Sequence, residues 1–212
     1  MDSPIYDESG DFLGTDDEGL QGDAIVMNKT DFTQGMSHKD AMAKGNTLDN
    51  MSTADATKFA NNGNFDNFLN HYNNLPNRID YSSNFTLTKE IADKHWQGKS
   101  GEGLYVNQAN IQLPGVSTAS FGNKNGSSFY KNFIWGLSNT GKVYGTLKLT
   151  LQNANSGTVH IGGKSFLDEY DYSMDGRPLR DAATWWGRPG DASDGKSYFI
   201  YGYGKATVPV KK

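Results

Sequence analysis

The ten residues from Asp168 to Arg177, DEYDYSMDGR, place four carboxylates, two tyrosines and an arginine in one short stretch. Carboxylates that are brought together need a counter-charge, a metal ion or a shared proton. A magnesium site needs only one or two carboxylates together with the phosphate oxygens of a substrate. Arginine matches such oxygens in bidentate fashion, and Arg177 and Arg180 are close enough in sequence to do so. The stretch therefore predicts a phosphate site or, as the alternative, a solvated charged hairpin with an ion pair.

Strands are expected to position this stretch, because the pattern after residue 98 is typical of a β-rich region. KVYGTLKLTL (142–151) alternates apolar and polar residues, with Val143, Leu147, Leu149 and Leu151 inward and a possible bulge at Gly145. TVHIGGKSF follows the turn QNANSG, and KSYFIYGYGKATVPV is expected to close the chain as a strand pair. Between them, RPLRDAATWWG has the pattern of one helix.

Helical signals dominate residues 29–98. Phe65, Phe68, Leu69 and Tyr72 form one apolar helical stripe that ends before Pro76. The expected N-cap residues are Ser37, Ser52 or Thr53, and Thr86 or Thr88. The sequence therefore predicts an α+β fold in which an N-terminal helical subregion packs on a C-terminal curved antiparallel sheet or open half-barrel. The predicted divisions are a leader or linker at 1–28, a helical subregion at 29–98 and a β-rich catalytic region at 99–212. Within the leader, residues 1–22 are expected to form turns and DAIVMN (23–28) a short apolar strand.

The composition limits the classes of function. The net charge of −4 over 212 residues gives no electrostatic indication of nucleic-acid binding. The absence of cysteine removes disulfides, thiol nucleophiles and Cys-ligated metals. No apolar run approaches the length of a membrane span, and no secretory signal follows Met1. The first 23 residues hold eight acidic residues and no basic one, whereas Lys and Arg recur from Lys164 onward.

The last third of the chain, roughly residues 141–212, resembles the catalytic domain of colicin M and its relatives. Asp168, Tyr170 and Asp171 match the Asp-x-Tyr-Asp pattern of that family. TWWG (184–187) falls where the family has Thr-x-x-Gly, and GKSYFI (195–200) matches the turn into the closing strands. These toxins cleave lipid II between the undecaprenyl chain and the pyrophosphate. The resemblance implies a hydrolase that acts on lipid II and thereby blocks peptidoglycan synthesis.

The family histidine has no counterpart between Asp171 and Thr184, and Asp175 or Gly176 occupies its place. Histidine suits proton transfer because its pKa lies near the working pH. Asp175 is one candidate to replace it as base or metal ligand, and His160 on the preceding strand is another. The alternative function is a binding module that recognises a lipid-linked pyrophosphate or a surface partner and cuts poorly.

The resemblance also implies roles for individual residues. Asp168 and Asp171 are the expected metal ligands, with Mg²⁺ or Ca²⁺ as the implied cofactor, and Tyr170 positions an acid or a phosphate oxygen. Arg177 is expected to clamp the pyrophosphate, with Arg180 as its competitor. Trp185 and Trp186 suit a membrane interface near the lipid tail, with packing inside the domain as the alternative.

The start of the chain, IYDESGDFLGTDDEGLQGDAIVMNKTDFTQGMSHKDAMAKG, resembles the junction behind the cores of Rhs-type polymorphic toxins of Bacteroidetes. That resemblance implies an effector cut from or injected with a larger polypeptide, for instance by type VI secretion, and acting in the periplasm of a target cell. The expected partners are lipid II and a cognate immunity protein. The domain itself is expected to be a monomer.

Overall fold

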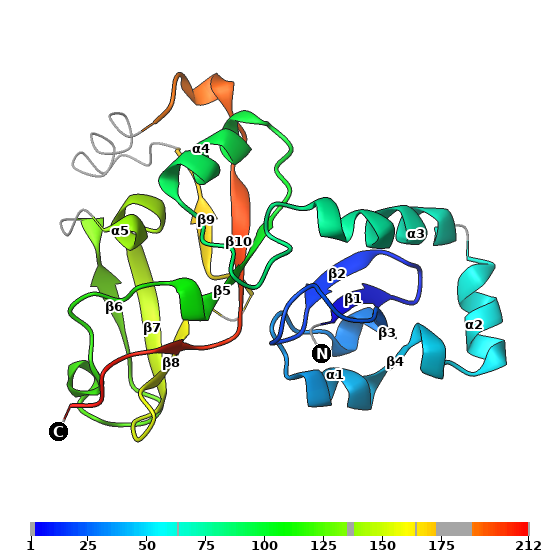
Figure 1. Ribbon diagram of the computed structural model, residues 1–212, viewed down its shortest axis with the longest axis horizontal. Helices are drawn as coiled ribbons and strands as arrows, with labels where there is room; N and C mark the ends of the chain where they lie inside the picture. The colour runs from blue at the N-terminus through cyan, green and yellow to red at the C-terminus, as the bar shows by residue number, and fades with distance from the viewer. Residues whose placement is uncertain (1–2, 63, 135–137, 164, 173–187, 212) are drawn as a thin grey trace. The chain divides into compact units, whose positions relative to one another are not determined.

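The computed structural model describes residues 3–62, 64–134, 138–163, 165–172 and 188–211. The chain divides into two compact units. Unit 1 comprises Met1–Phe85 with the short segments Tyr105–Gln108 and Gly202–Gly204, and unit 2 comprises Thr86–Leu104, Ala109–Tyr201 and Lys205–Lys212. Each unit contains both helices and strands, which confirms the predicted α+β class (Figure 1).

Unit 1 is built on a four-stranded sheet in the order β2-β1-β3-β4. β1 runs parallel to β3, and the other neighbouring strands are antiparallel. The turns predicted for residues 1–22 are confirmed at 8–10, but the prediction is wrong for β1 and β2, which lie in this range and are too short to show a clear alternation of apolar and polar residues. The strands are β1 (Pro4–Asp7), β2 (Phe12–Thr15), β3 (Ile25–Met27) and β4 (Gly45–Thr47).

Helices cover both faces of this sheet (Figure 1). α1 (His38–Lys44) packs on one face, and α2 (Thr53–Ala60) and α3 (Phe65–Asn74) pack on the other. Successive strand residues point to opposite faces, so each helix layer meets its own row of apolar side chains. The core on the α1 side comprises Ile5, Ile25, Met27 and Ala41, and the core on the opposite side comprises Tyr6, Ala24, Val26, Phe59 and Phe68.

Unit 2 contains two further sheets, in the orders β5-β10-β9 and β11-β8-β7-β6. Its helices are α4 (Lys89–Gln97) and α5 (Asn139–Val143). The strands are β5 (Leu104–Asn107), β6 (Ser128–Asn132), β7 (Thr146–Asn153), β8 (Thr158–Ile161), β9 (Asp168–Tyr170), β10 (Tyr198–Tyr203) and β11 (Ala206–Thr207). Three of the four residues of β5 (105–107) and the last two of β10 (202–203) are counted with unit 1.

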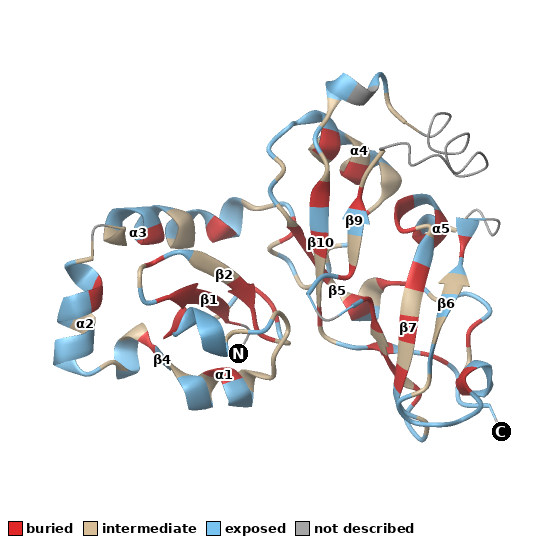
Figure 2. Cartoon of the chain, turned by 180° about the vertical axis from the view of Figure 1, so that it is seen from behind, coloured by how far each residue is buried: buried red, intermediate tan, exposed pale blue. Residues whose placement is uncertain are grey.

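The alternation predicted along β7 is confirmed, since Leu147, Leu149 and Leu151 are buried between more exposed neighbours (Figure 2). The strand begins later than predicted, because Val143 ends α5 and Gly145 then takes a φ of 63°, a conformation that glycine adopts without strain. The predicted final strand pair is wrong. β10 pairs with β9 and β11 pairs with β8, so the two closing strands belong to different sheets.

Candidate functional site

The Asp-x-Tyr-Asp segment forms β9 and its end. Asp168 and Tyr170 lie on the same face of the strand, because side chains alternate, and Glu169 lies on the other face opposite Phe199 of β10. Tyr170 is buried, whereas Asp168 is half-buried. Asp171 follows the strand, half-buried, and its Oδ1 accepts a hydrogen bond of 2.8 Å from the hydroxyl of Ser197. The segment is therefore held at two points, by the pairing of β9 with β10 and by Ser197 in the turn that precedes β10.

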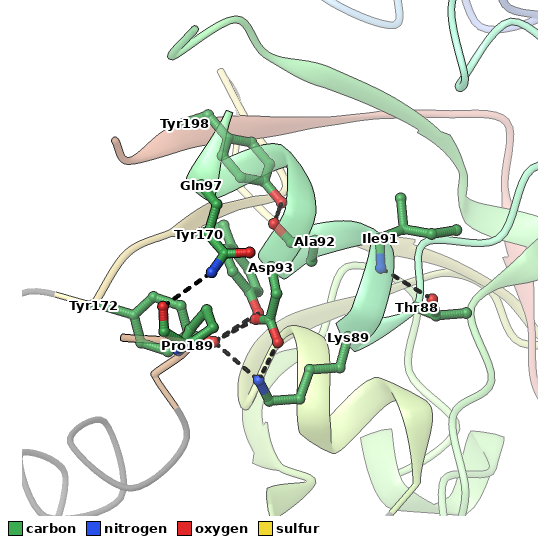
Figure 3. Close-up of polar contacts among 10 residues, drawn as sticks. All are labelled: Thr88, Lys89, Ile91, Ala92, Asp93, Gln97, Tyr170, Tyr172, Pro189 and Tyr198. Atoms are coloured by element: carbon green, nitrogen blue, oxygen red, sulfur yellow. Dashed lines mark hydrogen bonds and ion pairs between the residues drawn. The ribbon is translucent and has the colours of Figure 1, made fainter. Parts of the chain in front are cut away.

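The hydroxyl of Tyr170 reaches outside the Asp-x-Tyr-Asp segment and donates a hydrogen bond of 2.7 Å to Asp93 of α4. The hydroxyl of Tyr172 donates to the same Asp93 oxygen at 2.6 Å. Lys89, one helical turn before Asp93, places its Nζ 2.6 Å from the second carboxylate oxygen and 3.2 Å from the Tyr172 hydroxyl. Figure 3 shows these four side chains converging from α4 and from the end of β9.

We refer to Lys89, Asp93, Tyr170 and Tyr172 as the α4–β9 cluster. The hydroxyl oxygens of Tyr170 and Tyr172 are 2.9 Å apart, and each also contacts Asp93. The two hydroxyl protons are therefore shared among three oxygen–oxygen contacts. Tyr170 can direct its proton to either Asp93 or Tyr172, which gives the cluster two alternative hydrogen-bond patterns.

Burial and the neighbouring Asp93 charge raise the pKa of the Tyr170 and Tyr172 hydroxyls above their usual range. Both therefore stay protonated at neutral pH and act as donors to the carboxylate. Burial lowers the pKa of Lys89, but the hydrogen bonds to Asp93 and Tyr172 outweigh it and raise that pKa. The cluster accordingly combines one cation, one anion and two hydroxyls, and it can present a cation and a hydroxyl to a ligand.

Aromatic packing fixes the cluster on its inner side. Tyr170 stacks on Tyr198 with ring centroids 5.4 Å apart, and the Tyr198 hydroxyl donates to the carbonyl oxygen of Ala92 in α4 (Figure 3). The rings of Trp96 and Tyr172 pack edge-to-face, with their centroids 5.1 Å apart. Gly195 passes so close to the Trp96 indole that any Cβ at this position would clash with it. This close approach explains why a glycine begins the GKSYFI turn.

Five of the predicted site residues, Asp175, Arg177, Arg180, Trp185 and Trp186, lie outside the described residues, as does the helix predicted for RPLRDAATWWG. His160, the alternative base, lies on β8 in the four-stranded sheet, where its Nε2 donates to the carbonyl oxygen of Gly163 at 3.2 Å. The structure thus places Asp168 and Tyr170 on β9 and Asp171 directly after it. It adds Asp93, which contacts Tyr170, Lys89, which contacts Asp93, and Ser197, which contacts Asp171.

Sequence reasoning missed Lys89 and Asp93. They are an i, i+4 pair on α4, a spacing that predicts a surface ion pair on any helix. That spacing gives no indication of the tyrosines about 80 residues later in the chain. The sequence therefore indicated an ion pair at these two residues but not a site.

Hard oxygen donors are the ones that suit Mg²⁺, and Asp168 and Asp171 supply them. Within the described ranges no group of three or more His, Asp and Glu side chains is arranged to hold a metal ion. Two carboxylates with substrate phosphate oxygens would still meet the needs of magnesium, so the donor set fits the implied cofactor.

No protein-family model matches the chain, and the searches of curated proteins and of solved structures found no match either.

Proposed function

We propose that the chain is an antibacterial toxin whose unit 2 hydrolyses lipid II between the undecaprenyl chain and the pyrophosphate. The placement of the Asp-x-Tyr-Asp segment carries this proposal. Its tyrosine is buried and tied to α4, while Asp168 and Asp171 stay half-buried at the two ends of a short strand. A rigid strand that holds two carboxylates near solvent suits a site that must position a phosphate.

Hydrolysis would add water across the undecaprenyl–phosphate ester, giving undecaprenol and a pyrophosphoryl product. Asp168 and Asp171 would hold Mg²⁺, which when bound helps to neutralise the pyrophosphate. Asp171 is oriented by the Ser197 hydroxyl, so one of its oxygens has a fixed direction. It would act as a ligand or orient the attacking water, and Asp168 would be its partner ligand or acceptor.

The proposed setting follows from the substrate. Lipid II lies at the membrane surface, so the toxin would act in the periplasm of a target cell after secretion or injection. A cognate immunity protein would protect the producer. In the described residues no helix is both long and apolar enough to cross a membrane.

A second candidate is a module that binds a lipid-linked pyrophosphate without cutting it. It is favoured by the way protein donors already engage the carboxylates. Asp93 accepts from Lys89 and both tyrosines, and Asp171 accepts from Ser197, so neither carboxylate depends on a reacting ligand for its partners.

The role of Asp171 is tested by directing the full chain to the periplasm of a susceptible bacterium. We expect Asp171→Ala to lose killing, because it removes a proposed metal ligand. Glu169→Ala is the matched control, since Glu169 is an exposed carboxylate of the same segment whose side chain lies on the face of β9 opposite Asp168 and Tyr170. Equal killing by wild type and Asp171→Ala would contradict the catalytic assignment.

A further inference from the structure

Lys89 begins α4 and connects that helix to the end of β9. Its Nζ lies 2.6 Å from Asp93 and 3.2 Å from the hydroxyl of Tyr172, and 5.8 Å from the centroid of the Tyr172 ring. The side chain is 33% exposed, while that of Asp93 is 18% exposed. The ammonium group is therefore held by two elements and still open to solvent.

A second lysine on the same helix provides the comparison. Lys94 pairs with Glu90 at the same i, i+4 spacing, at 2.8 Å, but those side chains are 73% and 77% exposed. Such an exposed pair contributes little and fixes neither partner. Lys89 differs because its partner Asp93 is itself held by the hydroxyls of Tyr170 and Tyr172, so the carboxylate that the ammonium contacts has a fixed position.

The two tyrosines also keep Asp93 hydrogen-bonded if Lys89 shifts toward a ligand. A buried carboxylate that loses its only counter-ion is costly to the fold. Asp93 keeps two hydroxyl donors when Lys89 turns toward an incoming anion. The carboxylate is then still hydrogen-bonded, and the cost of the exchange is small.

The charge of the chain favours an anion at this site. Residues 86–212 hold fifteen Lys and Arg against ten Asp and Glu, a net charge of +5, whereas residues 1–85 hold five against fourteen, a net charge of −9. The basic part of the sequence is the part that carries the α4–β9 cluster, so an anion is attracted to it.

We propose that Lys89 is the pyrophosphate-binding cation of this site, with the Tyr172 hydroxyl beside it and Asp93 as the residue that positions both. This assignment rests on the proposed function and deepens it. The site would take its cation from α4, more than 80 residues before Arg177 and Arg180 in the sequence. The shared ligand chemistry is a pyrophosphate group, either free or attached to a polyprenyl chain.

Binding of inorganic pyrophosphate to the full chain, in the presence of Mg²⁺, tests the assignment by isothermal titration calorimetry. We expect Lys89→Ala and Lys89→Gln to weaken binding by roughly tenfold or more, the effect of losing one charge-assisted hydrogen bond. Lys89→Arg should recover part of the affinity. Lys94→Ala is the matched control and should bind like wild type.

Parallel titrations with undecaprenyl pyrophosphate in detergent micelles separate the two ligand sources. The same dependence on Lys89 in either arm supports the assignment. Unchanged affinity in both Lys89→Ala and Lys89→Gln would overturn it, as would the absence of binding in both arms. An equal loss in Lys94→Ala would also overturn it, because it would show attraction by charge alone. Thermal unfolding of each variant shows whether a loss of affinity comes from a loss of the fold. If Lys89→Ala and Lys89→Gln do not fold, the affinity of Lys89→Arg decides the outcome.

The assignment and the proposed function fail separately. If pyrophosphate binding depends on Lys89 but lipid II stays intact, the hydrolase proposal fails and the Lys89 assignment stands. If lipid II is cut and Lys89→Ala leaves its KM unchanged, the assignment fails and the hydrolase proposal stands.

Discussion

Tyr170 belongs to the segment that we propose as the site and also stabilises the fold. In the described part of the chain its hydroxyl contacts Asp93 and Tyr172, and its ring stacks on Tyr198. The sequence resemblance implies that this tyrosine positions an acid or a phosphate oxygen. The acid that it contacts is Asp93, which lies on α4 and not in the Asp-x-Tyr-Asp segment.

Removing the Tyr170 hydroxyl should therefore lower stability. Tyr170→Phe keeps the ring but deletes a hydrogen bond to a carboxylate, and such a bond contributes about 1.5–3 kcal/mol. We expect the free energy of unfolding, measured by urea denaturation, to fall by about this amount. Tyr130→Phe is the matched control, because Tyr130 is 72% exposed and its change should stay within about 0.5 kcal/mol. Equal stability of wild type and Tyr170→Phe would contradict the role given to Asp93.

At the residue scale, the sequence predicted a site at Asp168, Tyr170 and Asp171 but gave no indication of Lys89 or Asp93. The first three stand together in a recognisable spacing. The other two carry an ordinary helix-surface spacing, and their relation to Tyr172 arises only when α4 meets β9. Contacts between residues far apart in sequence leave no local pattern, which is why this half of the cluster was not predictable.

At the scale of elements, the helices of residues 29–98 were predicted well because their signals are local, whereas α5 was missed. Ser37, Ser52 and Thr88 cap α1, α2 and α4 through their side-chain oxygens, which confirms one of the predicted alternatives at each of the last two positions. The partners of β10 and β11 were not predictable, because pairing depends on which strands the chain brings alongside. The short strands β1 and β2 were missed among glycines and acidic residues that are typical of turns.

The contact between α3 and the sheet of unit 1 should be sensitive to acid. Tyr6 is fully buried, and its hydroxyl lies 2.9 Å from Nδ1 of His71. Burial raises the pKa of Tyr6, so Tyr6 donates the hydrogen bond and neutral His71 accepts it. Burial and, after it, the charge of Arg78 lower the pKa of His71 below its usual value of 6.5. Protonation of Nδ1 would remove the acceptor and leave the Tyr6 hydroxyl without it.

The sign of the effect follows from that pKa. Because folding lowers the pKa of His71, the unfolded chain binds more protons, so the contribution is complete above pH 6.5 and is lost as the pH falls below it. We expect the urea midpoint of wild type to decrease between pH 7 and pH 5. His71→Gln, which keeps an acceptor but does not titrate, should show a smaller decrease. Parallel decreases in both proteins would contradict the role of His71.

At the scale of the whole molecule, the division into two units coincides with a division of charge. Residues 1–85, whose net charge is negative, make up most of unit 1. Residues 86–212, whose net charge is positive, make up most of unit 2. Unit 1 nevertheless includes segments from later in the chain, since Asp80 is fully buried and its Oδ2 accepts from the backbone N–H of Tyr105 at 2.6 Å. A linear reading of the sequence assigns residues to consecutive ranges, so it cannot anticipate a unit built from three segments.

The central claim, that the chain hydrolyses lipid II, is tested most directly with purified lipid II. The full chain is incubated with lipid II and Mg²⁺, with and without EDTA, and the release of undecaprenol is followed by chromatography. We predict product formation that EDTA stops and that Asp171→Asn abolishes, while Glu169→Gln cleaves like wild type. Intact lipid II at high concentrations of wild-type protein in the presence of Mg²⁺ would contradict the claim and favour a binding module.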